Sequence, residues 1–206
     1  MDFSRKVGFE VRLRDGARAW IRPVQPEDKA RIEHGMKLLS PETRYLRFFN
    51  DAAELGGDLL QYLTEVDQQD HVAWIAVNHL LPGEPGIGIA RFIILPDDPS
   101  TAELALTVVD EYQGLGLGAA LMNILLVRAE QLGIRALRAI VLPDNHRVLR
   151  WMRRLGATSR YKDGLIELNL AVEGNHVPEL EPVKAPANPM SDQMAPMAPM
   201  ALAADG

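Results

Sequence analysis

The chain has 206 residues, of which 47% are hydrophobic and 24% are charged, and its net charge is −6. This composition is ordinary for a globular domain with its own core, and the negative charge argues against nonspecific nucleic-acid binding, which needs a basic surface. The sequence contains no cysteine, which excludes disulfides, cysteine-based metal sites and a cysteine nucleophile.

Neither a targeting segment nor a membrane span is expected. Residues 1–6 lack the apolar centre of a signal peptide. No run approaches the roughly 18 apolar residues that a transmembrane helix requires. We therefore expect a cytoplasmic protein without a membrane partner.

The first half of the chain is predicted to alternate short strands with helices. Asp15-Gly16 is a typical hairpin turn pair, and Ser40 followed by Pro41 is typical of a helix start, with serine as the N-cap. In chain order the pattern predicts strands at 11–13 and 19–21, helices from 27, from 41 and over 53–63, and strands at 71–77 and 86–95.

The second half repeats a strand–helix order and ends in a hairpin. Gly133 is the expected C-cap of the long helix that begins after residue 116. Asp163-Gly164 marks the last turn. The predicted elements are a turn at 96–100, a strand at 102–109, a helix after residue 116, a strand at 136–142, a helix through 155, and a return strand at 165–172.

The composition changes near residue 173. Prolines recur from Pro178 to Pro199, and Met-Ala-Pro occurs at Met194 and again at Met197. Such a segment cannot bury enough apolar surface to offset its ordering entropy. We therefore predict a folded domain over residues 1–172 and a disordered tail rich in Pro, Met and Ala over residues 173–206.

A glycine-rich stretch lies between the predicted strand 102–109 and the helix that follows it. Glycines permit a close backbone approach and positive φ, and the amides at a helix N-terminus attract anions. This order of elements predicts a pyrophosphate site. A Rossmann fingerprint is rejected because four residues, Asp110 to Gln113, separate the strand from Gly114. A Walker loop is excluded because no Gly-Lys-Ser/Thr follows.

The run Gln113-Gly114-Leu115-Gly116-Leu117-Gly118 resembles the signature loop of the GNAT acetyltransferases, and the resemblance extends over about residues 14–172. It implies an α/β (α+β) fold, the GNAT acyl-CoA N-acyltransferase fold, with a mixed central sheet flanked by helices. It also implies acetyl-CoA as the cosubstrate. The expected acetyl-CoA contacts are Leu106, Val108, Val109, Gln113, Gly114, Leu115, Gly116, Leu117, Gly118, Ala119 and Asn145. For Asn145 the alternative is that it only caps its helix.

Acetylation of an amine requires a base. A lysine amine has a pKa of about 10.4 and is protonated near neutral pH, so its proton must leave before nitrogen attacks the thioester. Glu103, the only carboxylate in the strand segment Ala102 to Leu106, is the candidate base. A backbone N–H near Val108 and Val109 is expected to stabilise the oxyanion. Without cysteine, direct transfer is favoured over an acyl-enzyme.

The segments Ser40–Phe49, Asp67–Ala76 and the Ala-Glu-x-Ala setting of Glu103 are similar to those of bacterial protein lysine acetyltransferases. This similarity implies a protein lysine as the acceptor. The alternatives are a small-molecule amine acetyltransferase and a non-catalytic acyl-CoA-binding regulatory module. Met152 stands where many GNAT enzymes have a tyrosine that acts as general acid, so no residue is assigned that role. The histidines lack metal-ligand spacing, and no metal is expected.

Overall fold

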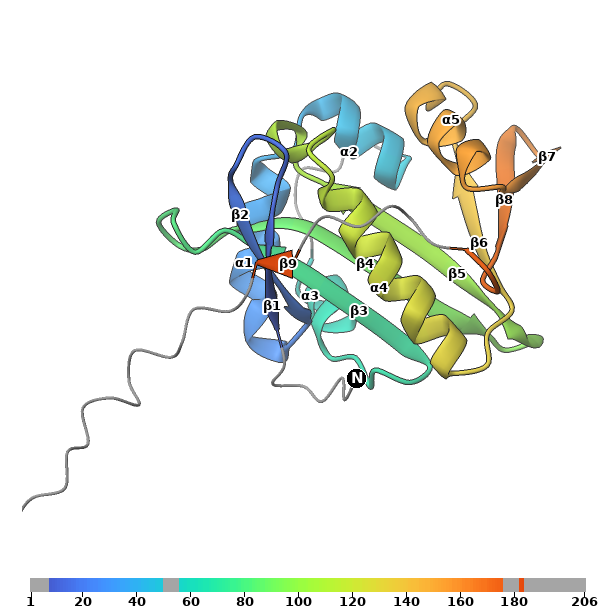
Figure 1. The fold of residues 1–206 in the computed structure, drawn as a ribbon, viewed down its shortest axis with the longest axis horizontal. Helices are drawn as coiled ribbons and strands as arrows, with labels where there is room; N and C mark the ends of the chain where they lie inside the picture. The colour runs from blue at the N-terminus through green and yellow to red at the C-terminus, as the bar shows by residue number, and fades with distance from the viewer. Residues whose placement is uncertain (1–7, 50–55, 176–181, 184–206) are drawn as a thin grey trace, which may run out of the picture.

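The computed structural model describes residues 8–49, 56–175 and 182–183, and these form one mixed sheet with helices on both faces (Figure 1). The strand order is β7-β8-β6-β5-β4-β3-β2-β1-β9. The strands are β1 (Phe9–Arg12), β2 (Arg18–Pro23), β3 (His71–Val77), β4 (Gly86–Leu95), β5 (Asp98–Val108), β6 (Ala136–Val141), β7 (Thr158–Lys162), β8 (Leu165–Ala171) and β9 (Pro182–Val183). The helices are α1 (Lys29–Lys37), α2 (Pro41–Phe48), α3 (Gly57–Thr64), α4 (Leu117–Gln131) and α5 (His146–Arg154), with 3-10 turns η1 (Pro26–Asp28) and η2 (Asp110–Tyr112).

One junction of the sheet is parallel. Strands β5 and β6 run in the same direction, with α4 as the crossover between them. The other paired strands are antiparallel. Because a parallel pair needs a long connection, the glycine-rich stretch is placed at the start of that crossover. The expected mixed sheet flanked by helices is confirmed.

The helices form two layers. Helix α4 packs against β3, β4 and β5 on one face, and its apolar residues Leu121, Met122 and Leu125 are almost fully buried. Helix α1 packs against β4, and α3 packs against α1 (Figure 1). The α1 contact requires glycine at position 35, because a Cβ there would collide with the Gly86 carbonyl oxygen.

Local signals in the sequence correspond to the observed starts and turns. The Ser40 hydroxyl accepts a hydrogen bond from the Thr43 amide at 3.1 Å, which makes it the N-cap of α2. Asp163 and Gly164 both have positive φ, at 51° and 81°, as a tight hairpin turn requires. Gly133 has a φ of 75° directly after the end of α4.

Two boundaries differ from the prediction. The predicted turn at 96–100 is shorter, since β5 already begins at Asp98. The Asp98 carboxylate accepts hydrogen bonds from Ser100 and Thr101, which orders this polar strand start in a way that hydrophobic periodicity does not reveal. The helix predicted at 53–63 is α3 at Gly57–Thr64, while residues 50–55 lie outside the described part of the chain.

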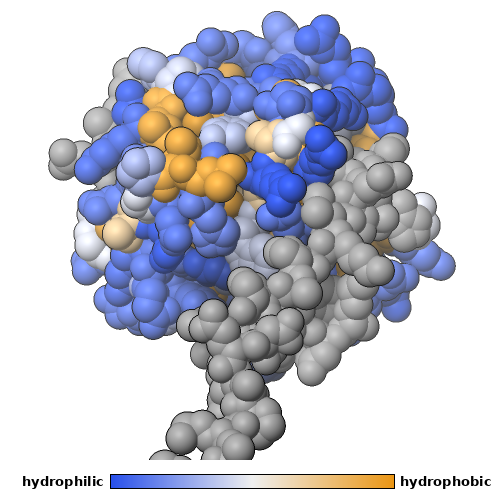
Figure 2. All heavy atoms as spheres, turned by 60° about the vertical axis from the view of Figure 1, so that its left-hand side comes forward, coloured by the Kyte–Doolittle hydropathy of each residue, from blue (hydrophilic) through white to orange (hydrophobic). Residues whose placement is uncertain are grey.

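Most of the predicted tail also lies outside the described residues. Within it, Pro182–Val183 pairs with β1 as an edge strand, the kind of strand in which proline is tolerated. Among the described residues, no helix has the length and hydrophobicity needed to cross a membrane. Figure 2 shows a largely hydrophilic surface with one orange apolar patch on the face that it presents.

Candidate functional site

The parallel pair β5–β6 opens into a fork. Pairing covers Thr101–Glu103 of β5 and Ala136–Arg138 of β6 and goes no further, although both strands continue. On its other side β5 remains paired with β4, and the Val109 amide donates to Ile87 O at 2.9 Å. Hydrogen-bonding directions alternate along an antiparallel strand. The amides of Leu106 and Val108 therefore face into the fork.

The glycine loop, residues 113–118, runs from the end of η2 into the first turn of α4. Gly114 and Gly116 have φ of 79° and 99°, a region that side-chain-bearing residues rarely adopt. Gly116 is the N-cap of α4, and its carbonyl accepts the Ala120 amide at 3.0 Å. Helix geometry then leaves the amides of residues 117–119 without an intrahelical acceptor. The loop presents a row of N–H donors at the positive end of a helix, which suits a pyrophosphate.

Gln113 joins this loop to two other elements. Its Nε2 donates to the Val108 carbonyl at 2.9 Å and to Thr43 Oγ1 of α2 at 3.3 Å. Its Oε1 accepts a hydrogen bond from Arg147 of α5. The side chain therefore connects the end of β5, α2 and α5 around the loop.

Asp110 fixes α2 next to the loop. Its carboxylate accepts hydrogen bonds from Ser40 N at 2.9 Å, Ser40 Oγ at 2.8 Å and Thr43 Oγ1 at 2.7 Å. Burial alone would raise the pKa of this carboxyl, but the hydrogen bonds from Ser40 and Thr43 outweigh it and hold the pKa below its ordinary value. Sequence reasoning missed this residue because its partners are about 70 positions away.

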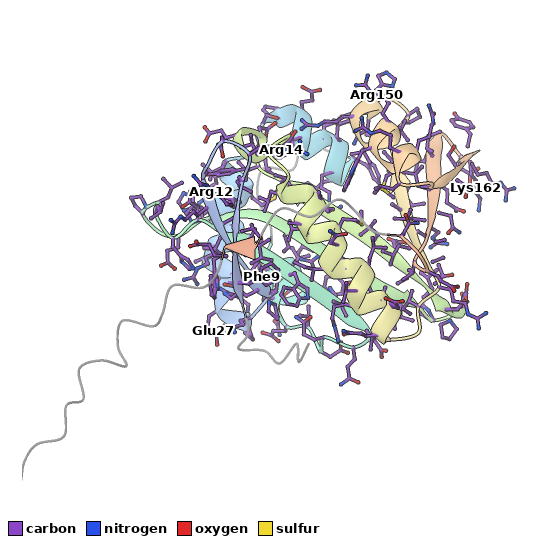
Figure 3. The ribbon with its side chains drawn as sticks, in the orientation of Figure 1. Phe9, Arg12, Arg14, Glu27, Arg150 and Lys162 are labelled. Carbon is purple, nitrogen blue, oxygen red and sulfur yellow. The ribbon has the colours of Figure 1, made fainter. Side chains whose placement is uncertain are left out.

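A cleft of about 700 Å³ runs over the loop and the fork. This volume lies in the range of small-molecule sites. Its cationic lining residues come from three separate elements: Arg14 after β1, Arg47 on α2, and Arg147 and Arg154 on α5. Arg14 also donates to the Gly114 carbonyl at 3.3 Å, and Figure 3 shows it at the tip of the β1–β2 hairpin beside the loop. Three carboxylates, those of Glu42, Asp110 and Asp144, also line the cleft, so the four arginines leave it a small excess of positive charge that suits a phosphorylated ligand.

Glu103 lies at the vertex of the fork. Arg138, opposite it on β6, donates to Glu103 Oε2 at 3.2 Å. The Glu103 side chain remains 51% exposed, so a reacting group can reach it from solvent.

Comparison with known proteins identifies the family. Residues 18–158 match the family described as Acetyltransferase (GNAT) domain. The chain belongs to the GNAT acetyltransferase family. It is 40% identical over 147 residues to Acetyltransferase Pat of Mycolicibacterium smegmatis, covering 71% of this chain and 43% of that protein. It is 35% identical over 128 residues to an acetyltransferase of Pseudomonas aeruginosa, covering 62% and 68%.

The fold agrees with that assignment. The crystal structure of the GNAT domain of S. lividans PAT matches this GNAT chain with a TM-score of 0.71 at 29% identity, covering 80% of this chain and 96% of that domain. The chain spans less than half of the length of the Mycolicibacterium smegmatis relative.

The GNAT cleft brings together most of the residues expected to contact acetyl-CoA. Those that line it are Leu106, Val108, Gln113, Gly114, Gly116, Gly118, Ala119 and Asn145. Val109 instead lines a smaller cavity on the other side of β5, and Leu117 is fully buried in the core. Leu115 packs against the core, and its carbonyl accepts the Arg14 amide at 3.1 Å. Asn145 caps α5 by accepting the Val148 amide at 3.2 Å and also borders the cleft.

The structure refines two further expectations, the identity of the oxyanion donor and the position of Glu103 relative to the cleft. The Val109 amide is bonded to Ile87, so of the two expected oxyanion donors only Val108 has an N–H directed into the fork. Glu103 does not line the cleft itself; it lies three residues, about 10 Å along the strand, from Leu106. Met152 is 1% exposed and packs in the core, whereas its neighbour Trp151 lines the cleft.

Proposed function

We propose that this chain transfers the acetyl group of acetyl-CoA directly to the side-chain amine of a protein lysine. The observation that carries the proposal is that a single cleft extends over both the glycine loop and the fork between β5 and β6. A row of helix N-terminal amides stands at one end of the cleft, and an accessible carboxylate stands on the strand that forms its wall. Membership of the GNAT family supports acetyl-CoA as the donor.

The cleft offers acetyl-CoA two kinds of contact. The amides of the glycine loop, with Arg14 and Arg147 beside them, suit the pyrophosphate. The inward amides of Leu106 and Val108 suit the pantetheine arm and the thioester oxygen, as an added strand would use them. Bound in this way, the thioester lies beside β5 at the open part of the fork.

The chemistry then requires a proton to leave the acceptor. Glu103 takes a proton from the lysine ammonium, and the neutral nitrogen attacks the thioester carbon. A C–N bond forms, the C–S bond breaks, and the nitrogen releases its second proton to solvent or to the departing sulfur. CoA leaves as a thiolate, a fair leaving group because thiols have a pKa of about 8.5. The Val108 amide stabilises the charge that develops on the carbonyl oxygen. With 51% of its side chain exposed, Glu103 is accessible to a long side chain that projects from another protein.

A single acceptor screen tests the proposal. The protein is incubated with acetyl-CoA and, in parallel, with folded lysine-containing proteins, lysine peptides and small amines, while CoA release and acetyl mass addition are followed. Modified lysines in proteins or peptides support the proposal. Turnover on small amines alone favours a small-molecule acetyltransferase, and tight CoA binding without any transfer favours a regulatory acyl-CoA-binding module.

A further inference from the structure

The sheet face that carries Glu103 also carries arginines. Directly opposed residues in a sheet project to the same side, and successive residues alternate. Arg91 of β4 is opposite Ala105, and Arg138 of β6 is opposite Glu103. Because Ala105 is two residues from Glu103, both arginines share its face. We call this side, where Arg47 of α2 and Arg91 line one cavity, the acceptor face.

Arg91 is a buried cation on this face. It is 5% exposed, and its Nη1 lies 3.2 Å from His71 Nε2. Burial, and then the nearby charge of Arg47, lower the pKa of Arg91 to about 10, which leaves it charged at neutral pH. Burial, with a further contribution from Arg91, lowers the pKa of His71 to about 4, so at neutral pH the imidazole is uncharged and does not balance the charge of Arg91. The described residues give Arg91 no carboxylate partner.

Arg47 reaches the same place from α2. It lines both the acetyl-CoA cleft and a small cavity of about 50 Å³ that Arg91 also lines. Its Nε is buried and has no hydrogen-bond partner among the described residues. Burial lowers the pKa of its guanidinium, and the charge of Glu103 opposes that effect. The two arginines are the charged groups in an otherwise mostly apolar lining, and the cavity is large enough for a few water molecules or one carboxylate.

The acceptor face has more positive than negative side chains, which does not favour the approach of a simple ammonium group. Arg47, Arg91 and Arg138 are cationic. The carboxylate of Glu103 pairs with Arg138 and acts on Arg47, and the carboxylate of Asp67 acts on His71, so cations still outnumber carboxylates here. The Nε of Arg138 is likewise buried without a described partner. An approaching ammonium would be repelled by the excess of guanidinium groups unless its own molecule brought negative charge.

We propose that Arg47 and Arg91 form a subsite for a carboxylate of the acceptor, placed next to the amine that is acetylated. This inference rests on the proposed acetyl transfer. The carboxylate would occupy the small cavity, where buried guanidinium N–H groups make strong hydrogen bonds to it. Two acceptors supply that chemistry: a lysine beside an aspartate or glutamate in a protein, and a free amino acid.

The experiment compares acceptors that differ only in charge. Three peptides of equal length present one lysine between two glutamates, two glutamines or two arginines. A second series compares free amino acids with their amides. We expect kcat/KM for the glutamate peptide to exceed that for the glutamine peptide by about 10- to 100-fold, the range for a hydrogen bond to a charged group. The kcat/KM for the arginine peptide should be lower than that for the glutamine peptide. A preference confined to free amino acids would assign the subsite to that source.

Variants test whether the preference comes from this pair. Arg47→Gln should reduce the ratio between the glutamate and glutamine peptides to within about 2-fold, whereas Arg47→Lys should keep part of it because the charge remains. Arg150→Gln is the matched control, since Arg150 is exposed on α5 and does not line the cleft (Figure 3). It should leave the ratio unchanged.

The outcomes separate this inference from the proposed function. Equal acetylation of the acidic and neutral acceptors in both series, the peptides and the free amino acids with their amides, would overturn the carboxylate subsite alone. A charge preference that survives Arg47→Gln would do the same. If no amine is acetylated, the proposed function fails and the subsite with it. If Arg47→Gln does not fold, the comparison of acceptors with the unaltered protein still tests whether the carboxylate subsite exists.

Discussion

Glu103 and Arg138 occupy the last paired position of β5 and β6, and their side chains form an ion pair of 3.2 Å at the vertex of the fork. The exposed fractions of the two side chains are 51% and 31%, and an exposed pair of this kind contributes only about 0–1 kcal/mol to stability. The pair therefore matters more for where it holds the carboxylate than for folding. It holds Glu103 at the vertex where the two strands begin to separate.

Glu103→Gln should lower kcat with little effect on the affinity for acetyl-CoA. Loss of a general base costs typically 10²- to 10⁴-fold. The deficit should be largest at low pH and should narrow as pH rises towards about 10, because free lysine amine then forms without a base. Steady-state rates over a pH series measure this, with CoA affinity followed by calorimetry.

The control for this change is Glu130→Gln at the exposed end of α4, which should leave the pH–rate profile as it is. An unaltered profile in Glu103→Gln would remove Glu103 as the base.

Gly116→Ala should raise the KM for acetyl-CoA. Gly116 has a φ of 99° at the N-cap of α4, and a non-glycine residue there is strained by about 1–2 kcal/mol. Relaxation of that strain would turn the loop amides away from the pyrophosphate. Gly133→Ala is a matched control, because Gly133 has a φ of 75° at the opposite end of the same helix.

Both variants should lose similar thermal stability, and only Gly116→Ala should lose acetyl-CoA affinity. Equal changes in KM for the two variants would show that strain in general, and not the loop geometry, controls binding.

The parts of the fold that depend on neighbouring residues could be predicted, and the parts that depend on distant ones could not. Ser40, Asp163-Gly164 and the glycine loop act within a few positions and were identified from their types. Arg91 is a polar residue in an otherwise apolar strand, and its burial beside His71 arises only when β3 and β4 pair. The direction of the Val109 amide likewise depends on the register with β4.

Asp110→Asn should destabilise the protein at neutral pH on the order of 1 kcal/mol, since it weakens charge-assisted bonds from Ser40 and Thr43 in a half-buried site. The folded-state pKa of Asp110 is depressed. Its contribution is therefore present above the ordinary carboxyl pKa and is lost as pH falls through the lower folded value. Urea unfolding at pH 7 and near pH 3 measures the difference. A stability gap that persists undiminished in acid would contradict the assigned cause.

His71→Gln should reduce the decrease in the free energy of unfolding that occurs as pH falls from about 6.5 to 4. The folded-state pKa of His71 is about 4, against an ordinary value of 6.5. In that window the unfolded chain binds a proton at His71 that the folded chain does not, so the stability of the unaltered protein falls as pH falls. The glutamine oxygen can still accept from Arg91 but cannot titrate. Urea midpoints at half-unit steps from pH 7.5 to pH 4 would show the flatter curve. Parallel curves for the two proteins would mean that the half-buried imidazole takes up its proton equally in the folded and unfolded states.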